Sequence, residues 1–260
     1  MAEILYLYAI AARGELTAPP AAGVDGRGRF AIVEQGRLAA LAGRVDSNEF
    51  SQESIDARAS DLDWIGAIGW RHQEVVNAVR ETTDVVPVRA FTLFSSETTL
   101  RDHLREREAA LVEVLDRIRG RDEWTLQVEF DGDRWPAAVE RRSPALAQLR
   151  AEAESAPEGR AYLLRKKIED ARRSAGREEE DRIVAELEER AREEFASPLV
   201  VERRQTRAGA FPQINILLDR SAADRVREFA GGLSRAWESD GVTIRLTGPW
   251  PPYTFVGSEP

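Results

Sequence analysis

Hydrophobic and polar positions divide the chain into two halves, each predicted to contain both strands and helices. In the first half, apolar runs at residues 5–10, 30–33 and 38–45 predict strands, and the last two form a hairpin. Residues 84–94 are strand-like around Pro87. Two predicted helices carry apolar stripes at helical spacing, one with Leu62, Ile65, Gly69, His72, Val76 and Val79, the other, capped by Ser96, with Leu100, Leu104, Leu111, Leu115 and Ile118.

The second half predicts strand, helix, strand, strand, helix and strand, with one extra helix inserted after the first strand. The elements are an alternating strand at 124–130, a short helix from Ser143-Pro144, a long helix at 158–195, strands at 198–204 and 212–218 joined near Gly209, a helix capped by Ser221, and a strand at 242–246. We therefore predict an α+β protein with an N-terminal α+β domain at 1–121. A ferredoxin-like βαββαβ domain follows at 122–246, and a tail at 247–260.

The last stretch of the chain combines three prolines with three aromatic residues. Proline fixes φ and keeps the preceding residue out of the helical region, so the tail is expected to be extended. Aromatic rings bury about 150–250 Å² each, which predicts a receiving groove on this protein or on a partner. The lack of a flexible linker favours packing on its own domains over a ligand role for a partner's groove. The residues concerned are Trp250, Pro251, Pro252, Tyr253 and Phe255.

Four segments carry a resemblance to one known family. They are Leu5-Tyr6-Leu7-Tyr8-Ala9-Ile10, Val86-Pro87-Val88-Arg89, Gly159-Arg160-Ala161-Tyr162-Leu163-Leu164-Arg165-Lys166-Lys167 and, most specific, Gly248-Pro249-Trp250-Pro251-Pro252-Tyr253-Thr254-Phe255-Val256. In this order they resemble the gas vesicle protein family GvpF/GvpL. One departure is that the family usually has Phe-Gly where this chain has Ala90-Phe91, which exchanges a large and a small side chain.

The resemblance implies a structural accessory protein of gas vesicles, without enzymatic activity. It further implies association with the major shell protein GvpA, and with other gas vesicle accessory proteins, during nucleation or assembly of the shell.

Composition narrows the class of protein further. The chain has 260 residues, a net charge of −9 and no cysteine. The acidic balance argues against nucleic acid as the main partner, because binding phosphates requires a basic face. The lack of cysteine excludes disulfides and thiolate metal sites and fits a reducing compartment. No apolar run has the length of a membrane span, and no positive segment precedes the apolar residues 4–12. We expect a cytoplasmic protein with no membrane partner.

His72 is the main candidate for chemistry, because it lies on the apolar face of a predicted helix. It is interpreted as a core or interface histidine, with a catalytic base or a switch as the alternative. The sequence shows no histidine pair at metal-ligand spacing and no phosphate-binding loop, so we predict no metal, cofactor or catalytic residue. The rival hypothesis is a small-molecule-binding or catalytic ferredoxin-like protein that uses His72 and Arg89.

A run of acidic residues interrupts the apolar stripe of the long predicted helix. Consecutive acids on a helix point in different directions and do not converge on one cation. Because residues 176–181 lack any apolar side chain, we expect this region to be exposed, either as a continuous helix or as a turn. It is a solvated elbow or a partner-binding surface formed by Glu178, Glu179, Glu180 and Asp181.

Overall fold

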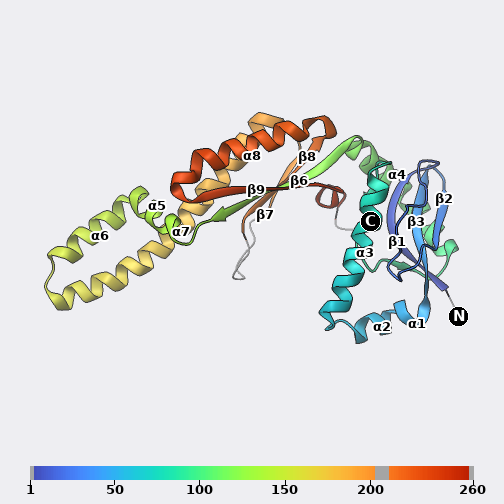
Figure 1. The fold of residues 1–260 in the computed structure, drawn as a ribbon, viewed down its shortest axis with the longest axis horizontal. Coiled ribbons are helices and arrows are strands. Elements are labelled where there is room, and N and C mark those ends of the chain that lie inside the picture. Colours follow the sequence, from blue (N-terminus) through green and yellow to red (C-terminus); the bar gives the residue numbers. More distant parts are fainter. Residues whose placement is uncertain (1–2, 203–210, 258–260) are drawn as a thin grey trace. The chain divides into compact units, whose positions relative to one another are not determined.

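The computed structural model describes residues 3–202 and 211–257 (Figure 1). It is a mixed α and β protein with two sheets. The chain forms two compact units, and the first is discontinuous in sequence. Unit 1 comprises residues 1–123 and 249–260, and unit 2 comprises residues 124–248. The predicted turn near Gly209 lies outside the described residues. No helix in the described part of the chain is long and apolar enough to cross a membrane.

The sheet of unit 1 is antiparallel, with the order β2-β3-β1-β4 and with β5 also paired to β1. The predicted hairpin is confirmed, and Gly36 at its turn has a φ of 55°. The strand-like stretch expected at 84–94 contains two short strands separated by a turn at Ala90-Phe91. The five strands are β1 (Glu3–Ala12), β2 (Phe30–Gln35), β3 (Leu38–Asp46), β4 (Val86–Pro87) and β5 (Leu93–Phe94).

Two long helices of unit 1 follow the predicted stripes with one exception. Ser96 caps the second helix in a capping box, and the five apolar residues predicted for its stripe are buried. On the first helix, Leu62 is 79% exposed and Ile68 is buried, so the predicted stripe was wrong at its first turn. The helices of unit 1 are α1 (Ser47–Phe50), α2 (Gln52–Ala57), α3 (Leu62–Arg80) and α4 (Glu97–Ile118).

The sheet of unit 2 has the strand order β7-β8-β6-β9. The predicted alternation in its first strand is confirmed, because Trp124, Leu126 and Val128 are buried. The last strand continues four residues beyond the predicted end at residue 246, through Gly248 and Pro249 to Trp250. The strands are β6 (Arg121–Phe130), β7 (Leu199–Glu202), β8 (Gln213–Asp219) and β9 (Val242–Trp250).

Helices of unit 2 cover its sheet and also extend away from it as a helical hairpin (Figure 1). Ser143 caps the first helix of this hairpin, with Pro144 in its first turn, as predicted. Ser221 is not a cap, because it lies in a 3₁₀ turn and the next helix has no side-chain cap. The helical elements are α5 (Arg134–Arg142), α6 (Pro144–Ser155), α7 (Glu158–Phe195), η1 (Arg220–Ala222), α8 (Ala223–Trp237) and η2 (Glu238–Asp240).

Candidate functional site

The C-terminal segment, residues 249–257, packs against unit 1. Gly248 precedes it with a φ of 127°, a conformation that suits glycine, and the 3₁₀ turn η3 (Tyr253–Phe255) follows the prolines. Pro251, Pro252, Phe255 and Val256 are buried, and Tyr253 packs against the core cluster that contains Tyr6 and Tyr8. Trp250 differs from the other rings because it is 39% exposed. The expectation that all three aromatic side chains fill a groove was therefore wrong for Trp250.

Two buried carboxylates at the start of β6 hold this segment. Glu123 is 6% exposed and accepts hydrogen bonds from the amide (2.9 Å) and hydroxyl (2.7 Å) of Thr254. Asp122 is 5% exposed and accepts from Arg80 of α3 at 2.7 Å. Arg80 also donates to the carbonyl of Pro249 at 3.4 Å. Buried charges are tolerated only when they are paired, so the segment and these residues stabilise one another.

A second cation anchors the far end of the segment. Arg117, in the last turn of α4, donates from Nη2 to the carbonyl of Phe255 at 2.8 Å. A guanidinium bonded to a backbone oxygen makes a charge-assisted hydrogen bond, which is stronger than a neutral one. Both ends of the segment are thus fixed through main-chain atoms, so its course depends little on which side chain stands at position 250.

His72 lies on α3 beside the same segment and is 3% exposed. Its Nε2 donates to the carbonyl of Val88 at 2.9 Å, and the Tyr253 hydroxyl lies 3.4 Å from the same nitrogen. Its ring stacks on Tyr8 and meets Tyr6 at its edge. Burial lowers the pKa of His72 to about 4, although the bond to Val88 opposes this effect. His72 is therefore a neutral core histidine at physiological pH.

The surroundings of His72 do not favour the rival hypothesis. Burial also raises the pKa of Tyr6, Tyr8 and Tyr253, so the phenols around the imidazole are neutral as well. Arg89, the second residue of that hypothesis, is exposed. The buried imidazole of His72 and the exposed guanidinium of Arg89 therefore do not form one polar site.

Phe91 stands where the family motif usually has glycine, and its backbone has a conformation that suits glycine. Its φ is 67°, in the left-handed region where a side chain is disfavoured and glycine is not. The Phe91 amide donates to the Tyr6 hydroxyl at 2.9 Å, and its ring lies 5.6 Å from that of Trp64. Aromatic contacts and a buried acceptor therefore hold a residue in a backbone conformation that glycine would adopt without strain.

The acidic run of α7 is only partly exposed. The helix is continuous through it, and Glu178 and Asp181 are exposed as expected. Glu179 is 5% exposed, with oxygens 2.6 Å from Arg182 and 3.7 Å from Arg142, so the prediction of exposure was wrong for this residue. Glu180 is half-buried, and burial raises its pKa. Residues 176–181 lack apolar side chains, but α5, which the sequence pattern did not predict, packs beside them. Its Arg142 contacts Glu179, and this contact contributes to the burial of Glu179.

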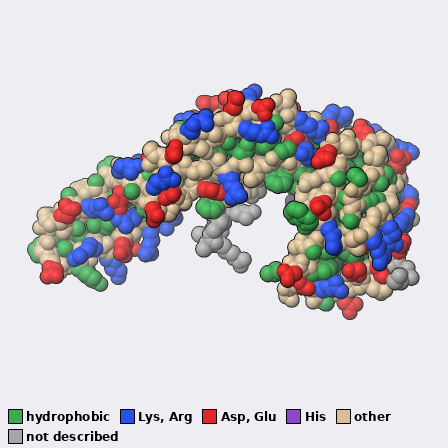
Figure 2. All heavy atoms as spheres, viewed as in Figure 1, with side chains coloured by type: hydrophobic (Ala, Val, Ile, Leu, Met, Phe, Trp, Pro, Cys, Tyr) green, Lys and Arg blue, Asp and Glu red, His purple; other side chains and the backbone are tan. Residues whose placement is uncertain are grey.

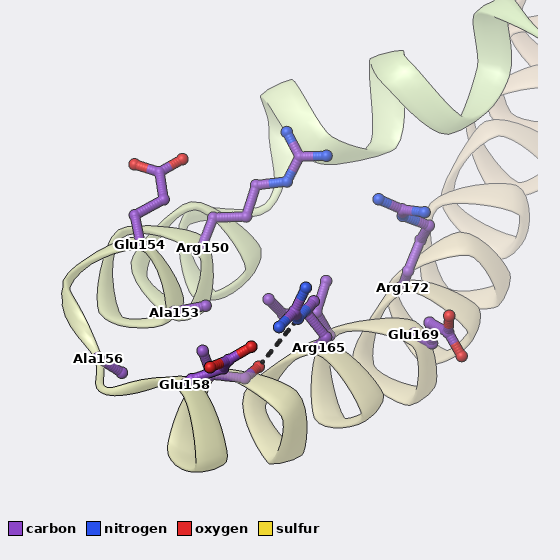
Figure 3. A pocket seen from close by; sticks show the side chains of 10 residues that line it. Arg150, Ala153, Glu154, Ala156, Glu158, Arg165, Glu169 and Arg172 are labelled. Carbon is purple, nitrogen blue, oxygen red and sulfur yellow. Dashed lines mark hydrogen bonds between the residues drawn. The ribbon is translucent and has the colours of Figure 1, made fainter.

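The α6–α7 hairpin contains an open hollow of about 650 Å³ (Figure 3). Arg150, Arg165 and Arg172 line it, together with Glu154 on α6 and Glu158 and Glu169 on α7. Glu140 binds two of these arginines, with 3.1 Å to Arg150 and a contact to Arg172. Figure 2 shows the same mixing of both charge signs over the visible surface of the hairpin. The hollow therefore offers a charge-balanced surface and does not favour anions.

Comparisons with known proteins agree over nearly the whole chain. A family model described as gas vesicle synthesis protein GvpL/GvpF matches residues 4–257. Gas vesicle protein L from Streptomyces sp. is 27% identical, over 98% of this chain and 93% of that protein. Gas vesicle protein L2 from Halobacterium salinarum is 30% identical, over 76% of this chain and 74% of that protein.

Two solved structures share the fold. The crystal structure of GvpF from Microcystis aeruginosa superposes with a TM-score of 0.65 at 15% identity, covering 98% of this chain and 99% of that one. GvpF from Anabaena sp. gives a TM-score of 0.66 at 16% identity, covering 99% and 98%. At this level of identity, the likeness shows the arrangement of elements and nothing about binding.

Proposed function

Because this chain belongs to the GvpL/GvpF family of gas vesicle synthesis proteins, we propose that it is a non-enzymatic accessory protein that associates with the major shell protein GvpA and with other accessory proteins during nucleation or assembly of the shell. The family match carries the proposal, since it spans both units and the C-terminal segment. It also confirms the resemblance read from the sequence motifs. The proposed location is the gas vesicle and the surrounding cytoplasm.

We propose that the C-terminal segment has two roles. Its buried part stabilises unit 1, and its exposed Trp250 contacts a protein partner. Phe255 is 8% exposed, and the segment around it is anchored by Glu123 and Arg117, which supports a structural role. Trp250 presents 39% of its surface to solvent at the start of this anchored segment. Exposed aromatic residues on rigid backbone are favourable anchors for protein partners, because little conformational entropy is lost on binding.

The test uses cells that carry a gas vesicle gene cluster without this gene. Supplying the wild-type chain should restore vesicles and should allow GvpA to be captured with it. Trp250→Ala should leave the fold intact and reduce both readouts, whereas Trp70→Ala, which removes a 69% exposed tryptophan elsewhere in unit 1, serves as the matched control. Normal vesicles without the gene would refute the proposed function. Equal effects of the two substitutions would refute the role of Trp250.

His72 distinguishes this proposal from the rival one. A folded His72→Gln protein should support vesicle assembly, because His72 serves the core of unit 1 and reaches no solvent. A folded variant that abolishes assembly would instead favour a small-molecule site or a switch. Thermal melting and circular dichroism of the variant establish that it is folded.

The exposed part of the acidic run is proposed as a second partner surface. Glu178 and Asp181 face solvent on α7, and Glu180 is half-buried beside them. Reversing the charges of Glu178 and Asp181 should slow association with a basic partner and weaken the dependence of its rate on salt. An unchanged rate would refute this surface. Glu179 is left out of the variant because it is buried.

We also propose that residues 122–246 form a ferredoxin-like domain with inserted helices, distinct from an N-terminal domain at 1–121 and the tail at 247–260. The strand order β7-β8-β6-β9 supports this, because a βαββαβ chain places its first and third strands in the centre. Helices α7 and α8 are then its two crossover helices, and α5 and α6 are the insertion. An isolated 122–248 fragment that fails to fold would contradict the domain assignment.

A further inference from the structure

Unit 2 carries an exposed apolar and basic patch on the second and third turns of α7. Tyr162 and Leu163 are 67% and 66% exposed, and they are adjacent in sequence. Lys166 and Lys167 follow four residues later, so each lysine lies beside one of these side chains on the helix surface. Neither lysine forms an ion pair or hydrogen bond with any residue in the described part of the chain. We call these four residues the tip patch.

The opposite end of α7 contributes to an open groove with the complementary character. This groove, between α7 and α8, has a volume of about 430 Å³. Phe229 and Leu233 give it apolar lining, and Gly232 also lines it without a side chain of its own. Glu193 on α7 and Glu228 on α8 stand at its two sides. We call these residues the acidic groove.

Two carboxylates of the acidic groove are not paired with any cation among the residues that the structure describes. The two other charged residues that line it are paired, Arg190 with Glu186 at 2.7 Å and Glu194 with Arg225 at 2.8 Å. Glu193 and Glu228 have no ion pair or hydrogen bond to the residues that the structure describes. A hollow with Phe229 in its lining and two carboxylates that form no ion pair with the described residues suits a ligand that combines apolar side chains with two cations. The tip patch has this composition.

We propose that the tip patch of one molecule docks into the acidic groove of a second copy of this chain. A molecule cannot fill its own groove, because the tip patch and Glu193 lie on one continuous helix, some 26 residues or about 40 Å apart. Lys166 and Lys167 then meet Glu193 and Glu228, while Tyr162 and Leu163 cover the half-buried Phe229.

This contact joins two different surfaces, so it is heterologous. Each copy keeps one free tip patch and one free acidic groove after pairing, and the contact propagates into chains of copies unless the rotation closes a ring. The inference concerns self-association and does not depend on GvpA binding. Its failure would therefore leave the proposed function untouched.

The experiment measures the association of the full chain by sedimentation velocity over a wide concentration range, at low and at physiological ionic strength. The wild type should associate, more strongly at low salt, because exposed charges are screened by ions. Lys166→Glu/Lys167→Glu and Glu193→Lys/Glu228→Lys should each weaken association about tenfold or more, because each brings like charges together. All four positions are exposed, so the fold is expected to survive, and melting curves verify this.

Charge exchange gives the decisive result. Mixing the two double variants, or combining all four substitutions in one chain, should restore association, because opposite charges face each other again. Glu106→Lys/Glu113→Lys on α4 is the control, since it changes the net charge as much as the groove variant but at exposed positions of unit 1. A wild type that stays monomeric overturns the proposal. So does association that neither double variant weakens, or that charge exchange fails to restore.

Discussion

Replacing Phe255 by alanine should destabilise unit 1 much more than replacing Trp250, although tryptophan is the larger residue. Phe255 is 8% exposed, so almost its whole ring is removed from water, and truncations at such sites cost about 3–5 kcal/mol. Trp250 keeps 39% of its surface exposed, so about 1–2 kcal/mol is expected. A domain has only about 5–15 kcal/mol of stability in total. The Phe255 variant should therefore be visibly closer to unfolding.

Urea denaturation of the full chain, followed by circular dichroism, measures the shift in midpoint for each variant. Because the chain has two units, hydrogen exchange must show which one has lost stability. Faster exchange in β1 and α3 after Phe255→Ala, with unchanged exchange in β6 beyond residue 124 and in β8, is the expected result. Equal midpoints for the two variants would refute the argument that burial of the segment, and not ring size, sets its contribution.

Three further predictions concern buried or strained groups. The folded state holds the pKa of His72 at about 4 against an ordinary 6.5, so the unfolded chain binds more protons between these values. The contribution of neutral His72 to stability is therefore fully present above pH 6.5, and the free energy of unfolding falls by up to about 3 kcal/mol as the pH drops to 4. In denaturant titrations, the free energy of unfolding should change less with pH for His72→Gln than for the wild type. Phe91→Gly should be more stable than Phe91→Ala by about 1 kcal/mol in urea melts, because both variants lose the ring and only glycine is unstrained at a φ of 67°. Equal urea midpoints for the two variants would show that the backbone at position 91 is not strained. Glu179→Ala should lower the melting temperature more than Glu178→Ala, because Glu179 is 5% exposed and is the ion-pair partner of the partly buried Arg142, whereas Glu178 is exposed and its loss should change stability by less than about 0.5 kcal/mol.

Elements with a long periodic pattern and a clear start could be predicted from the sequence. Helix α4 has an apolar stripe over five turns and a Ser96 cap, and α7 was bounded correctly at both ends. Helix α5 was missed because it has only nine residues, many of them charged, with a proline in the first turn. Short elements of this kind are specified by the surface they cover, and that surface does not exist until the chain has folded.

The contacts of the candidate site were harder to predict than its identity. The tail motif singled out the right segment, but nothing local shows that Glu123 will accept two hydrogen bonds from Thr254, more than a hundred residues later. The burial of Glu179 was missed for a related reason, because its nearby cation Arg142 comes from the unpredicted α5. A pair of acids opening an alternating apolar strand, as Asp122 and Glu123 do, was the one available signal of buried charge.

The discontinuity of unit 1 affects how the protein can be made. The ribosome delivers residues 1–123 first, so Asp122 can pair with Arg80 at once, whereas Glu123 lacks Thr254 and the site of Phe255 stays unfilled until the C-terminal segment follows. Unit 2 is synthesised entirely in between, so it can fold on the ribosome while unit 1 is still unfinished. Completion of unit 1 therefore requires translation through the C-terminal segment, and a chain truncated before Phe255 leaves uncovered the surface that this segment packs on.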